Sequence, residues 1–414
     1  MNQTKVTGDN NIVVKDIKGE VINIIINGNA LPTELLDNLV TDDNQWSKGL
    51  AQAIRNQQIS VSNNAIDIYQ HYGWLIETFL QKLSAKIDKN KAKTDAEKKA
   101  MKLRRLSFMT EAFQSSLRYL CYIQVAQIFH LPEPPKCPKA IRFLQCSDDD
   151  YQQFDFLHCL YETTDALGEE HSFVPQIVTL VGQIRDNEDD LGETVKFMSG
   201  CRNELINNNL NDLEHLDNLL EGFLTGLVHW LKQLAFLAKY RLISIKDISL
   251  NYRLGSVQKT QFMHHYGELH GMYNTMQHEG GDYYNIRAVD DVFTYNQSVL
   301  LLDAKNVDDG LDKIHDRATY LSLSPLIIDK SVFANKITQT PEIHYYIGRK
   351  GGKSKYTFAH YKDELSLDGQ PLKSNKPVTV SKTNIKDPKL DELFSQIKDV
   401  FGKQIKWLYN CVIV

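Results

Sequence analysis

An arginine and several asparagines stand together in the segment GCRNELINNNL, residues 200–210. Arg202 could stabilise the charge of a phosphate group, with Asn203 and Asn207 donating or accepting hydrogen bonds beside it. Acid–base catalysis also needs a group that titrates near neutral pH, and an asparagine amide does not. His215 is the next histidine, and in a continuous helix it would lie more than about three turns beyond the arginine. We therefore predict that this segment has no catalytic residue.

Arg202 then needs a structural explanation. Its segment lies between two hydrophobic stretches, where one helix is expected to end and another to begin. We expect Arg202 to orient this helix end, or to pair with a neighbouring carboxylate such as Glu204 or Asp212.

Four histidines fall within residues 263–282, together with acidic side chains: His264, His265, His270 and His278. Imidazole and carboxylate groups bind transition metals, and both can transfer protons. The spacing matches neither the HExxH pattern of a metal-binding helix nor a Cys/His finger. We therefore predict a polar loop without a metal or a cofactor, and the four histidines are the weak alternative ligands.

Basic side chains surround a glycine pair in GRKGGKSK, residues 348–355. Arg349, Lys350 and Lys353 could hold a phosphate or another anion together with backbone amides. A P-loop would require the GKS/T arrangement between a strand and a helix, which is missing here. We favour a solvated hairpin tip, and anion binding by these three residues is the alternative.

Apolar side chains recur with helical spacing over residues 62–131 and 150–240. In the first region the pattern predicts a single helix over residues 65–87. The charged stretch at residues 86–105 either extends a helix or forms a solvated loop. In the second region, residues 212–240 carry a continuous apolar stripe, which predicts a central helix of a bundle.

From residue 241 the apolar period changes to alternation, and short β-branched and aromatic segments predict strands. Near the end of the chain, Asp387 as N-cap and Pro388 at the first helical position predict an amphipathic helix. The predicted fold class is α+β. The expected parts are an N-terminal β segment at residues 1–30, a helical domain at 31–240, a β-rich module at 241–372, and a linker with the C-terminal helix at 373–414. We expect the helical and β parts to have separate cores.

Two short β-branched stretches within residues 5–29 predict an N-terminal β-hairpin. A lone hairpin is marginal in water, and the second strand has apolar side chains on both faces, which a solvated edge strand would avoid. We therefore expect this strand to pair with a second copy of the chain, with a dimer favoured, while docking onto the chain's own β module is the alternative. The expected self-association residues are Ile22, Asn23, Ile24, Ile25 and Ile26.

The composition is that of an ordinary globular chain: 414 residues are 42% hydrophobic and 24% charged, with a net charge of −5. No apolar run approaches the roughly 20 residues of a membrane span, and the N-terminus lacks a secretory signal pattern, so we expect a cytoplasmic protein without membrane contact. Nucleic acid is a weakly supported partner. The basic run within residues 86–105 is interrupted by acidic residues and contains no aromatic side chain.

Two features resemble bacterial conflict proteins. GDNNIVVKDIKGEVINI, residues 8–24, resembles the short Gly-Asp-Asn-Asn β segment at the start of many antiphage-defence proteins, where it is thought to mediate association. Paired helices, FMSGCRNELINNNL, a Leu-rich helix and a β region with YLSLSPLIID follow one another over roughly residues 60–335. This order resembles the HEPN-type helical domains of bacterial defence systems.

In catalytic HEPN-type domains an Arg, usually followed by Asn, precedes a His by about four to six positions, and two such motifs cut RNA across a dimer. Arg202 and Asn203 match this motif, but Asn207, Asn208 and Asn209 occupy the positions where the histidine belongs. The resemblance therefore implies a non-catalytic sensor, scaffold or regulatory protein of an antiphage-defence system. Such a protein would act through self-association and through a separately encoded effector or a phage-derived protein. The alternative is an atypical ribonuclease that uses Arg202 with asparagine or distant histidine partners.

Overall fold

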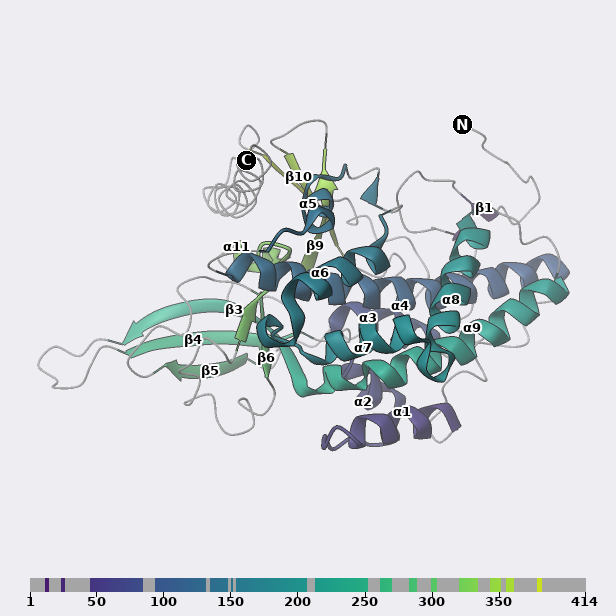
Figure 1. Ribbon diagram of the computed structural model, residues 1–414, viewed down its shortest axis with the longest axis horizontal. Coiled ribbons are helices and arrows are strands. Elements are labelled where there is room, and N and C mark those ends of the chain that lie inside the picture. The colour runs from purple at the N-terminus through teal and green to yellow at the C-terminus, as the bar shows by residue number, and fades with distance from the viewer. Residues whose placement is uncertain are drawn as a thin grey trace, which may run out of the picture.

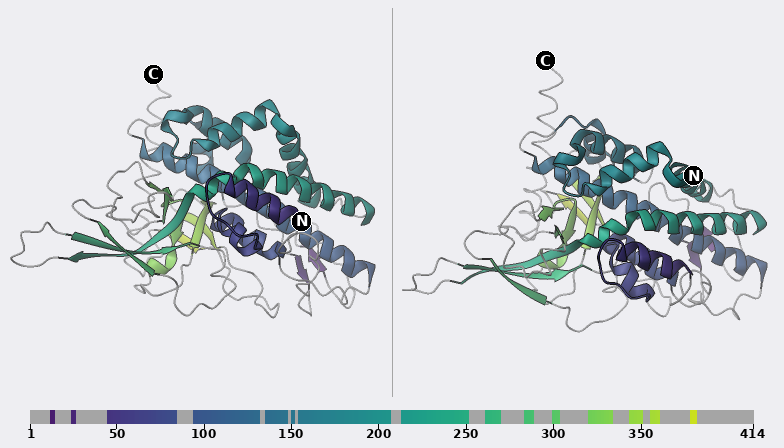
Figure 2. Two further views of the ribbon diagram at one scale, coloured as in Figure 1. Left: turned by 90° about the horizontal axis from the view of Figure 1, so that it is seen from below. Right: turned by 60° about the horizontal axis from the view of Figure 1, so that its bottom comes forward.

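The computed structural model describes residues 12–14, 24–26, 45–84, 94–131, 135–147, 150–151, 154–206, 213–251, 261–269, 283–288, 299–303, 320–333, 343–350, 355–360 and 378–381. Helices occupy one end of an elongated molecule and a β arm projects from the other (Figure 1). Two further views preserve this arrangement (Figure 2). The molecule has the mixed α+β character that the change of apolar period predicts.

The helical body is built around one long helix, α4, which packs against α3, α6, α8 and α9. α4 is 36 residues long and begins at Asp95, so the second half of the charged stretch at 86–105 is helical. The α-helices of this body are α1 (Gln45–Arg55), α2 (Ala65–Gln70), α3 (Trp74–Ser84), α4 (Asp95–His130), α5 (Pro138–Gln145), α6 (Phe156–His171), α7 (Gln176–Asp186), α8 (Leu191–Ile206) and α9 (Leu213–Gln233). Short 3-10 helices, η2 (Glu188–Asp190) and η3 (Leu234–Lys239), connect α7 to α8 and α9 to the first long strand.

The single helix predicted over residues 65–87 is two helices, α2 and α3. Gly73 interrupts them with φ +84°, a backbone conformation that side chains with a Cβ rarely adopt. A Cβ on this glycine would also lie 3.1 Å from the Tyr119 ring on α4. The apolar pattern continues across the break because both helices contribute buried side chains to the same hydrophobic core. Periodicity alone therefore could not show the turn.

Two antiparallel sheets follow the helices, and their strand orders are β5-β4-β3-β6-β7 and β11-β10-β9-β8. The strands are β3 (Tyr240–Asn251), β4 (Gln261–Glu268), β5 (Tyr283–Ala288), β6 (Val299–Asp303), β7 (Tyr320–Ser322), β8 (Ile327–Asp329), β9 (Ile343–Arg349), β10 (Lys355–His360) and β11 (Val378–Ser381). A four-residue helix, α11 (Lys330–Phe333), follows β8. The predicted change to β structure is confirmed, because β3 begins at Tyr240 directly after η3.

β3 pairs with different strands along its length. Its first half pairs with β6, from Tyr240 opposite Asp303 to Ser244 opposite Val299. Its second half pairs with β4 and continues outward as the arm seen in Figure 1. The register with β4 shifts between Ile245 and Asp247, so a β-bulge lies at this position and changes the direction of the side chains around it.

The prediction of separate helical and β cores is wrong. The main hydrophobic core runs continuously from the helices into both sheets, with members that include Phe113, Phe223, Trp230, Leu301, Leu326 and Tyr346. Tyr122 on α4 donates a hydrogen bond of 2.8 Å to the Tyr346 carbonyl on β9. A smaller cluster, made of Ile243, Ile245, Tyr266, Leu300 and Leu302, covers the other face of the five-stranded sheet. The sheets pack directly against the helices, so one core serves both parts.

The predicted N-terminal hairpin is present as β1 (Ile12–Val14) and β2 (Ile24–Ile26). The strands pair antiparallel, with Ile12 opposite Ile26. Among the strands that the structure describes, these two pair only with each other and extend neither of the larger sheets. Several predicted positions lie outside the described residues: Ile22, Asn23, Asn207, His270, His278, Lys353 and the C-terminal helix after Asp387.

Candidate functional site

Arg202 lies in the last part of α8, four residues before this helix ends at Ile206. Its guanidinium is directed toward α4, where Glu111 and Arg118 are its electrostatic neighbours. Burial lowers the pKa of Arg202, Glu111 partly offsets this effect, and Arg118 adds to it. The carboxylate of Glu111 also pairs with Arg118 at 3.4 Å, and both side chains are almost fully buried. Arg202 itself is half-buried, and its acidic electrostatic neighbour is Glu111 of α4; the structural role predicted for Arg202 stays a prediction.

His215 is much closer to the Arg202 segment than a continuous helix would place it. The chain reverses between α8 and α9, and His215 Nε2 lies 2.9 Å from Glu204 Oε2. The inference of a distance beyond about three helical turns is therefore wrong, because residues 202 and 215 do not share one helix. The expectation that Glu204 is a partner of Arg202 is also not met, since this carboxylate faces α9.

Arg202 and the pair of Glu204 and His215 nevertheless lie on different sides of α8. Arg202 and Glu204 are two positions apart, which on an α-helix separates their side chains by about 200°. Arg202 points toward α4, whereas Glu204 and His215 form a half-exposed pair at the α9 side. Asn203 lies between these two directions and is exposed. The guanidinium of Arg202 and the imidazole of His215 therefore have different neighbours, on α4 and on α8 respectively.

His264 and His265 lie in strand β4, so the prediction of a polar loop is wrong for this part of residues 263–282. They are opposite Ile248 and Asp247 of β3, respectively. In the part of the chain that the structure describes, no group of three or more His, Cys, Asp or Glu side chains is arranged to hold a metal.

Arg349 and Lys350 lie at the end of β9, where the chain turns into β10. The Arg349 guanidinium carbon lies 5.5 Å from the centre of the Tyr356 ring across the hairpin. Its backbone N–H donates to the Cys146 carbonyl at 2.9 Å. Lys350 is exposed, and its N–H donates to the Lys355 carbonyl, which closes the turn. The hairpin is as predicted, and anion binding by this turn stays a prediction.

A buried polar cluster that the sequence interpretation missed joins the two sheets. Lys246 on β3 pairs with Asp329 on β8, and both side chains are at most 1% exposed. Lys246 Nζ also donates to Ser331 Oγ at 2.6 Å. Asp329 accepts further hydrogen bonds from the Ser244 hydroxyl at 2.8 Å, the Ser331 hydroxyl at 2.7 Å and the Ser331 N–H at 3.0 Å. The available signal was a lysine inside the predicted strand sequence LISIKDIS, at a position two residues after Ser244.

A lysine beside a serine is also the arrangement of a Ser–Lys nucleophile, in which a neutral amine removes the serine proton. Here the Ser331 hydroxyl donates to Asp329 instead. Burial lowers the pKa of Lys246, but the Asp329 carboxylate opposes this shift and favours the charged amine. Ser331 is 3% exposed, so no substrate could reach it without a change in the fold. The cluster is a cross-link between β3 and β8.

Comparison with protein-family models, with curated proteins and with solved structures finds no match for this chain. None of the helices in the described ranges combines the length and the apolar character needed to cross a bilayer.

Proposed function

We propose that this chain is a non-catalytic sensor, scaffold or regulatory protein of a bacterial antiphage-defence system, acting through self-association and protein partners. The defence setting rests on the resemblance to HEPN-type domains and to the Gly-Asp-Asn-Asn β segment. The observation that supports a non-catalytic role is the orientation of Arg202 toward the buried pair of Glu111 and Arg118.

Ribonuclease chemistry of the HEPN type needs a proton-transferring group and a charge-stabilising arginine at the same phosphate. His215 is the described histidine nearest in sequence to Arg202, but it pairs with Glu204 on the opposite face of α8.

An RNA-cleavage assay tests this part of the proposal. The full chain is incubated with single-stranded RNA and with tRNA, beside the variants Arg202→Ala and Arg142→Ala. Arg142 is exposed on α5 and serves as the matched control for loss of one positive charge. We expect all three proteins to leave both RNAs intact. Cleavage by the wild type that is lost in Arg202→Ala, and kept in Arg142→Ala, would establish the atypical ribonuclease. Loss of that cleavage in His215→Ala would then identify its partner.

The self-association part rests on the hairpin of β1 and β2. Two paired three-residue strands leave backbone groups at their outer edges, and such edges are satisfied by another strand. Light scattering of the full chain, of Ile25→Lys and of a chain that starts at Leu31 measures whether this segment forms the contact. We expect a dimer for the full chain and a monomer for both variants. If all three are monomers, or if all three are dimers, association through this segment is wrong.

A further inference from the structure

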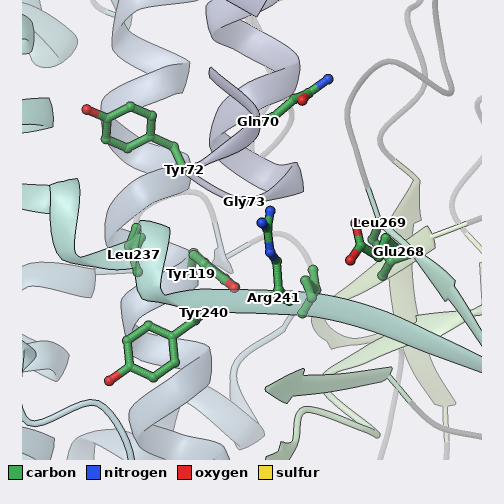
Figure 3. A pocket seen from close by; sticks show the side chains of 10 residues that line it. Gln70, Tyr72, Gly73, Tyr119, Leu237, Tyr240, Arg241, Glu268 and Leu269 are labelled. Carbon is green, nitrogen blue, oxygen red and sulfur yellow. The ribbon is translucent and has the colours of Figure 1, made fainter. Parts of the chain in front are cut away.

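The cavity beside the α2–α3 turn, whose lining includes Arg241 and Glu268, is too small for a ligand (Figure 3). It has room for about one water molecule. The buried cluster of Lys246, Asp329 and Ser331 is different, because its side chains already touch one another. A reaction between side chains in contact needs no space for a bound molecule.

We propose that Lys246 and Asp329 join in an intramolecular isopeptide bond, an amide between the lysine nitrogen and the aspartate carboxyl carbon. Lys246 Nζ is in contact with Asp329 Oδ2, which is bonded to that carbon. Both side chains are at most 1% exposed. The bond links β3 of one sheet covalently to β8 of the other. It involves neither Arg202 nor the N-terminal hairpin, so it is independent of the proposed function.

Burial favours the amide over the ion pair. Two charges that are removed from water carry a desolvation cost even when they pair, and the amide that replaces them is neutral. Burial also lowers the pKa of Lys246, against the opposing effect of the Asp329 carboxylate, and so makes its proton easier to remove. The fixed contact replaces a collision between two molecules, and the exclusion of water protects the product from hydrolysis.

Ser331 connects the two reacting groups and provides a path for protons. Its hydroxyl accepts a hydrogen bond from Lys246 Nζ at 2.6 Å and donates one to Asp329 Oδ1 at 2.7 Å. A proton can therefore pass from Nζ to Ser331 Oγ while the hydroxyl proton of Ser331 passes to Oδ1. This relay converts the ion pair into a neutral amine and a carboxylic acid, and no charge has to leave the buried cluster.

The neutral amine then attacks the carboxyl carbon. The lone pair of Lys246 Nζ forms a bond to Asp329 Cγ, and the electron pair of the Cγ–Oδ2 double bond moves onto Oδ2. The Ser244 hydroxyl donates a hydrogen bond of 2.8 Å to Oδ2 and stabilises this negative charge. A second proton passes from Nζ through Ser331 to Oδ1, the Cγ–Oδ1 bond breaks, and Oδ1 leaves as water. Oδ2 becomes the carbonyl oxygen, so the ammonium and the carboxylate give one amide and one water.

Mass spectrometry of the intact, denatured full chain tests this inference. We expect the wild type to be lighter than its sequence by the mass of one water molecule. Lys246→Met and Asp329→Leu should have their full sequence masses, because each lacks one reacting group. Lys239→Met is the matched control, since it removes a neighbouring lysine on η3, and it should keep the loss of water. Trypsin should not cleave after Lys246 in the wild type, and one branched peptide should contain both Lys246 and Asp329.

The proton path is tested by the rate of the same mass change, followed in samples withdrawn after cell-free synthesis. Ser331→Ala should lose water at least about tenfold more slowly than the wild type, because the relay hydroxyl is missing. Ser331→Thr should restore the rate, since it keeps the hydroxyl. An unchanged rate in Ser331→Ala overturns the relay.

A folded wild-type chain at its full sequence mass overturns the isopeptide bond. A loss of water that persists in Lys246→Met overturns it as well, because cyclisation of an aspartate onto the following backbone amide gives the same mass change. If neither Lys246→Met nor Asp329→Leu folds, the tryptic digest of the wild type still decides. Separate linear peptides for Lys246 and Asp329 contradict the bond, and a branched peptide confirms it, since backbone cyclisation does not join two peptides.

Discussion

Lys246 and Asp329 show at the residue scale how a buried charge can specify a contact between two sheets. Removing either charge from water is costly, and the cost is offset only when the remaining hydrogen-bonding positions are filled. Asp329 meets this condition through Lys246 and the hydroxyls of Ser244 and Ser331. Ser244 and Lys246 are two positions apart on β3, so both side chains point to the same face of the sheet, toward Asp329 of β8. The cluster therefore specifies which parts of the two sheets lie together.

We predict that Lys246→Met destabilises the protein by about 3–5 kcal/mol, because it leaves the Asp329 carboxylate buried without its cation. The double variant Lys246→Met/Asp329→Leu should lose less, since no buried charge then remains. Urea unfolding of the wild type, the two single variants and the double variant gives the coupling free energy. Additive losses in the double variant would show that the two charges do not interact.

At the scale of elements, the α7–α8 corner depends on the absence of a side chain at Gly192. A Cβ there would lie 2.6 Å from the Ile184 carbonyl oxygen and 2.9 Å from Asn187 Oδ1. Asn187 has φ +53°, and its Oδ1 accepts a hydrogen bond from the Glu193 N–H. The carbonyl belongs to the backbone of α7 and cannot rotate away as a flexible side chain could.

Gly192→Ala should therefore destabilise the protein by about 1–3 kcal/mol through this overlap. Gly200→Ala is its control in the same helix, since a Cβ at Gly200 meets nothing within 4 Å. The control should stabilise the protein by roughly 0.5–1 kcal/mol, because alanine loses less conformational freedom in a helix than glycine does. Thermal unfolding of both variants measures whether the unfolding temperature falls for Gly192→Ala and rises for Gly200→Ala. Equal effects would show that the close approach to Ile184 has no energetic consequence.

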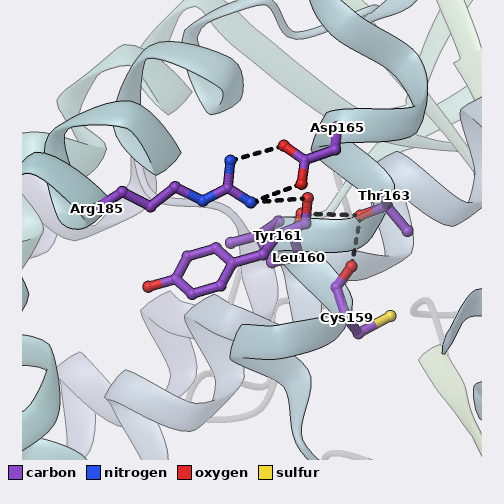
Figure 4. Close-up of polar contacts among 6 residues, drawn as sticks. All are labelled: Cys159, Leu160, Tyr161, Thr163, Asp165 and Arg185. Atoms are coloured by element: carbon purple, nitrogen blue, oxygen red, sulfur yellow. Dashed lines mark hydrogen bonds and ion pairs between the residues drawn. The ribbon is translucent and has the colours of Figure 1, made fainter.

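A bidentate ion pair between Asp165 and Arg185 joins α6 and α7 (Figure 4). Arg185 Nη1 lies 2.6 Å from Asp165 Oδ1, and Nη2 lies 2.7 Å from Asp165 Oδ2. The guanidinium carbon also lies 4.9 Å from the centre of the Tyr161 ring. Hydrogen bonding to Arg185 is the main cause that lowers the pKa of Asp165, and desolvation opposes it.

Because the folded-state pKa of Asp165 is lowered, its contribution to stability is fully present above the unfolded value of 3.8 and is lost as the pH falls through the folded value. Arg185→Ala should cost about 0.5–1 kcal/mol at pH 7, a small loss because both groups are largely exposed. The charge-dependent part of this loss should disappear as the pH falls through the lowered pKa of Asp165. Urea unfolding of the wild type and of Arg185→Ala at several pH values measures this loss of stability. A difference between wild type and variant that stays constant from pH 7 to acid would assign the effect to the Tyr161 contact instead.

At the scale of the whole molecule, the helices and sheets share one core. Phe113 on α4 packs edge-on against Phe223 and Trp230 of α9, with ring centres 6.5 and 5.7 Å apart. α4 then reaches the β part through Tyr122, whose hydroxyl binds both Tyr151 and the Tyr346 carbonyl. Loss of either part would expose apolar surface of the other.

We therefore predict a single cooperative unfolding transition. Hydrogen exchange followed by mass spectrometry should show peptides of α4 and of β9 losing protection at the same urea concentration. Tyr122→Phe should lower the free energy of unfolding by about 1–3 kcal/mol, because it removes the hydrogen bond from Tyr122 to the buried Tyr346 carbonyl. The urea midpoints of the α4 and β9 peptides should therefore fall together. Separate transitions for the helical and β peptides would show that the two parts unfold independently, each with its own core.

Local sequence was sufficient for much of the fold. The helical character of the first half, the change to strands at Tyr240 and the hairpin of β9 and β10 were all predictable. These features depend on apolar period and on turn residues, which are properties of neighbouring positions in the chain. The absence of a histidine shortly after Arg202 was equally visible in the sequence.

The tertiary structure decided which distant residues meet. Folding of α9 back along α8 brings His215 to Glu204, and strand pairing places Arg241 and Glu268 on one face. The pair of Lys246 and Asp329 joins residues 83 positions apart. Such contacts depend on chain reversals, on strand register and on the packing of apolar faces, and a shift of register by one residue would send every side chain of a strand to the other face. Apolar period shows that a face will be buried, but the element that covers it is selected only when the whole chain packs.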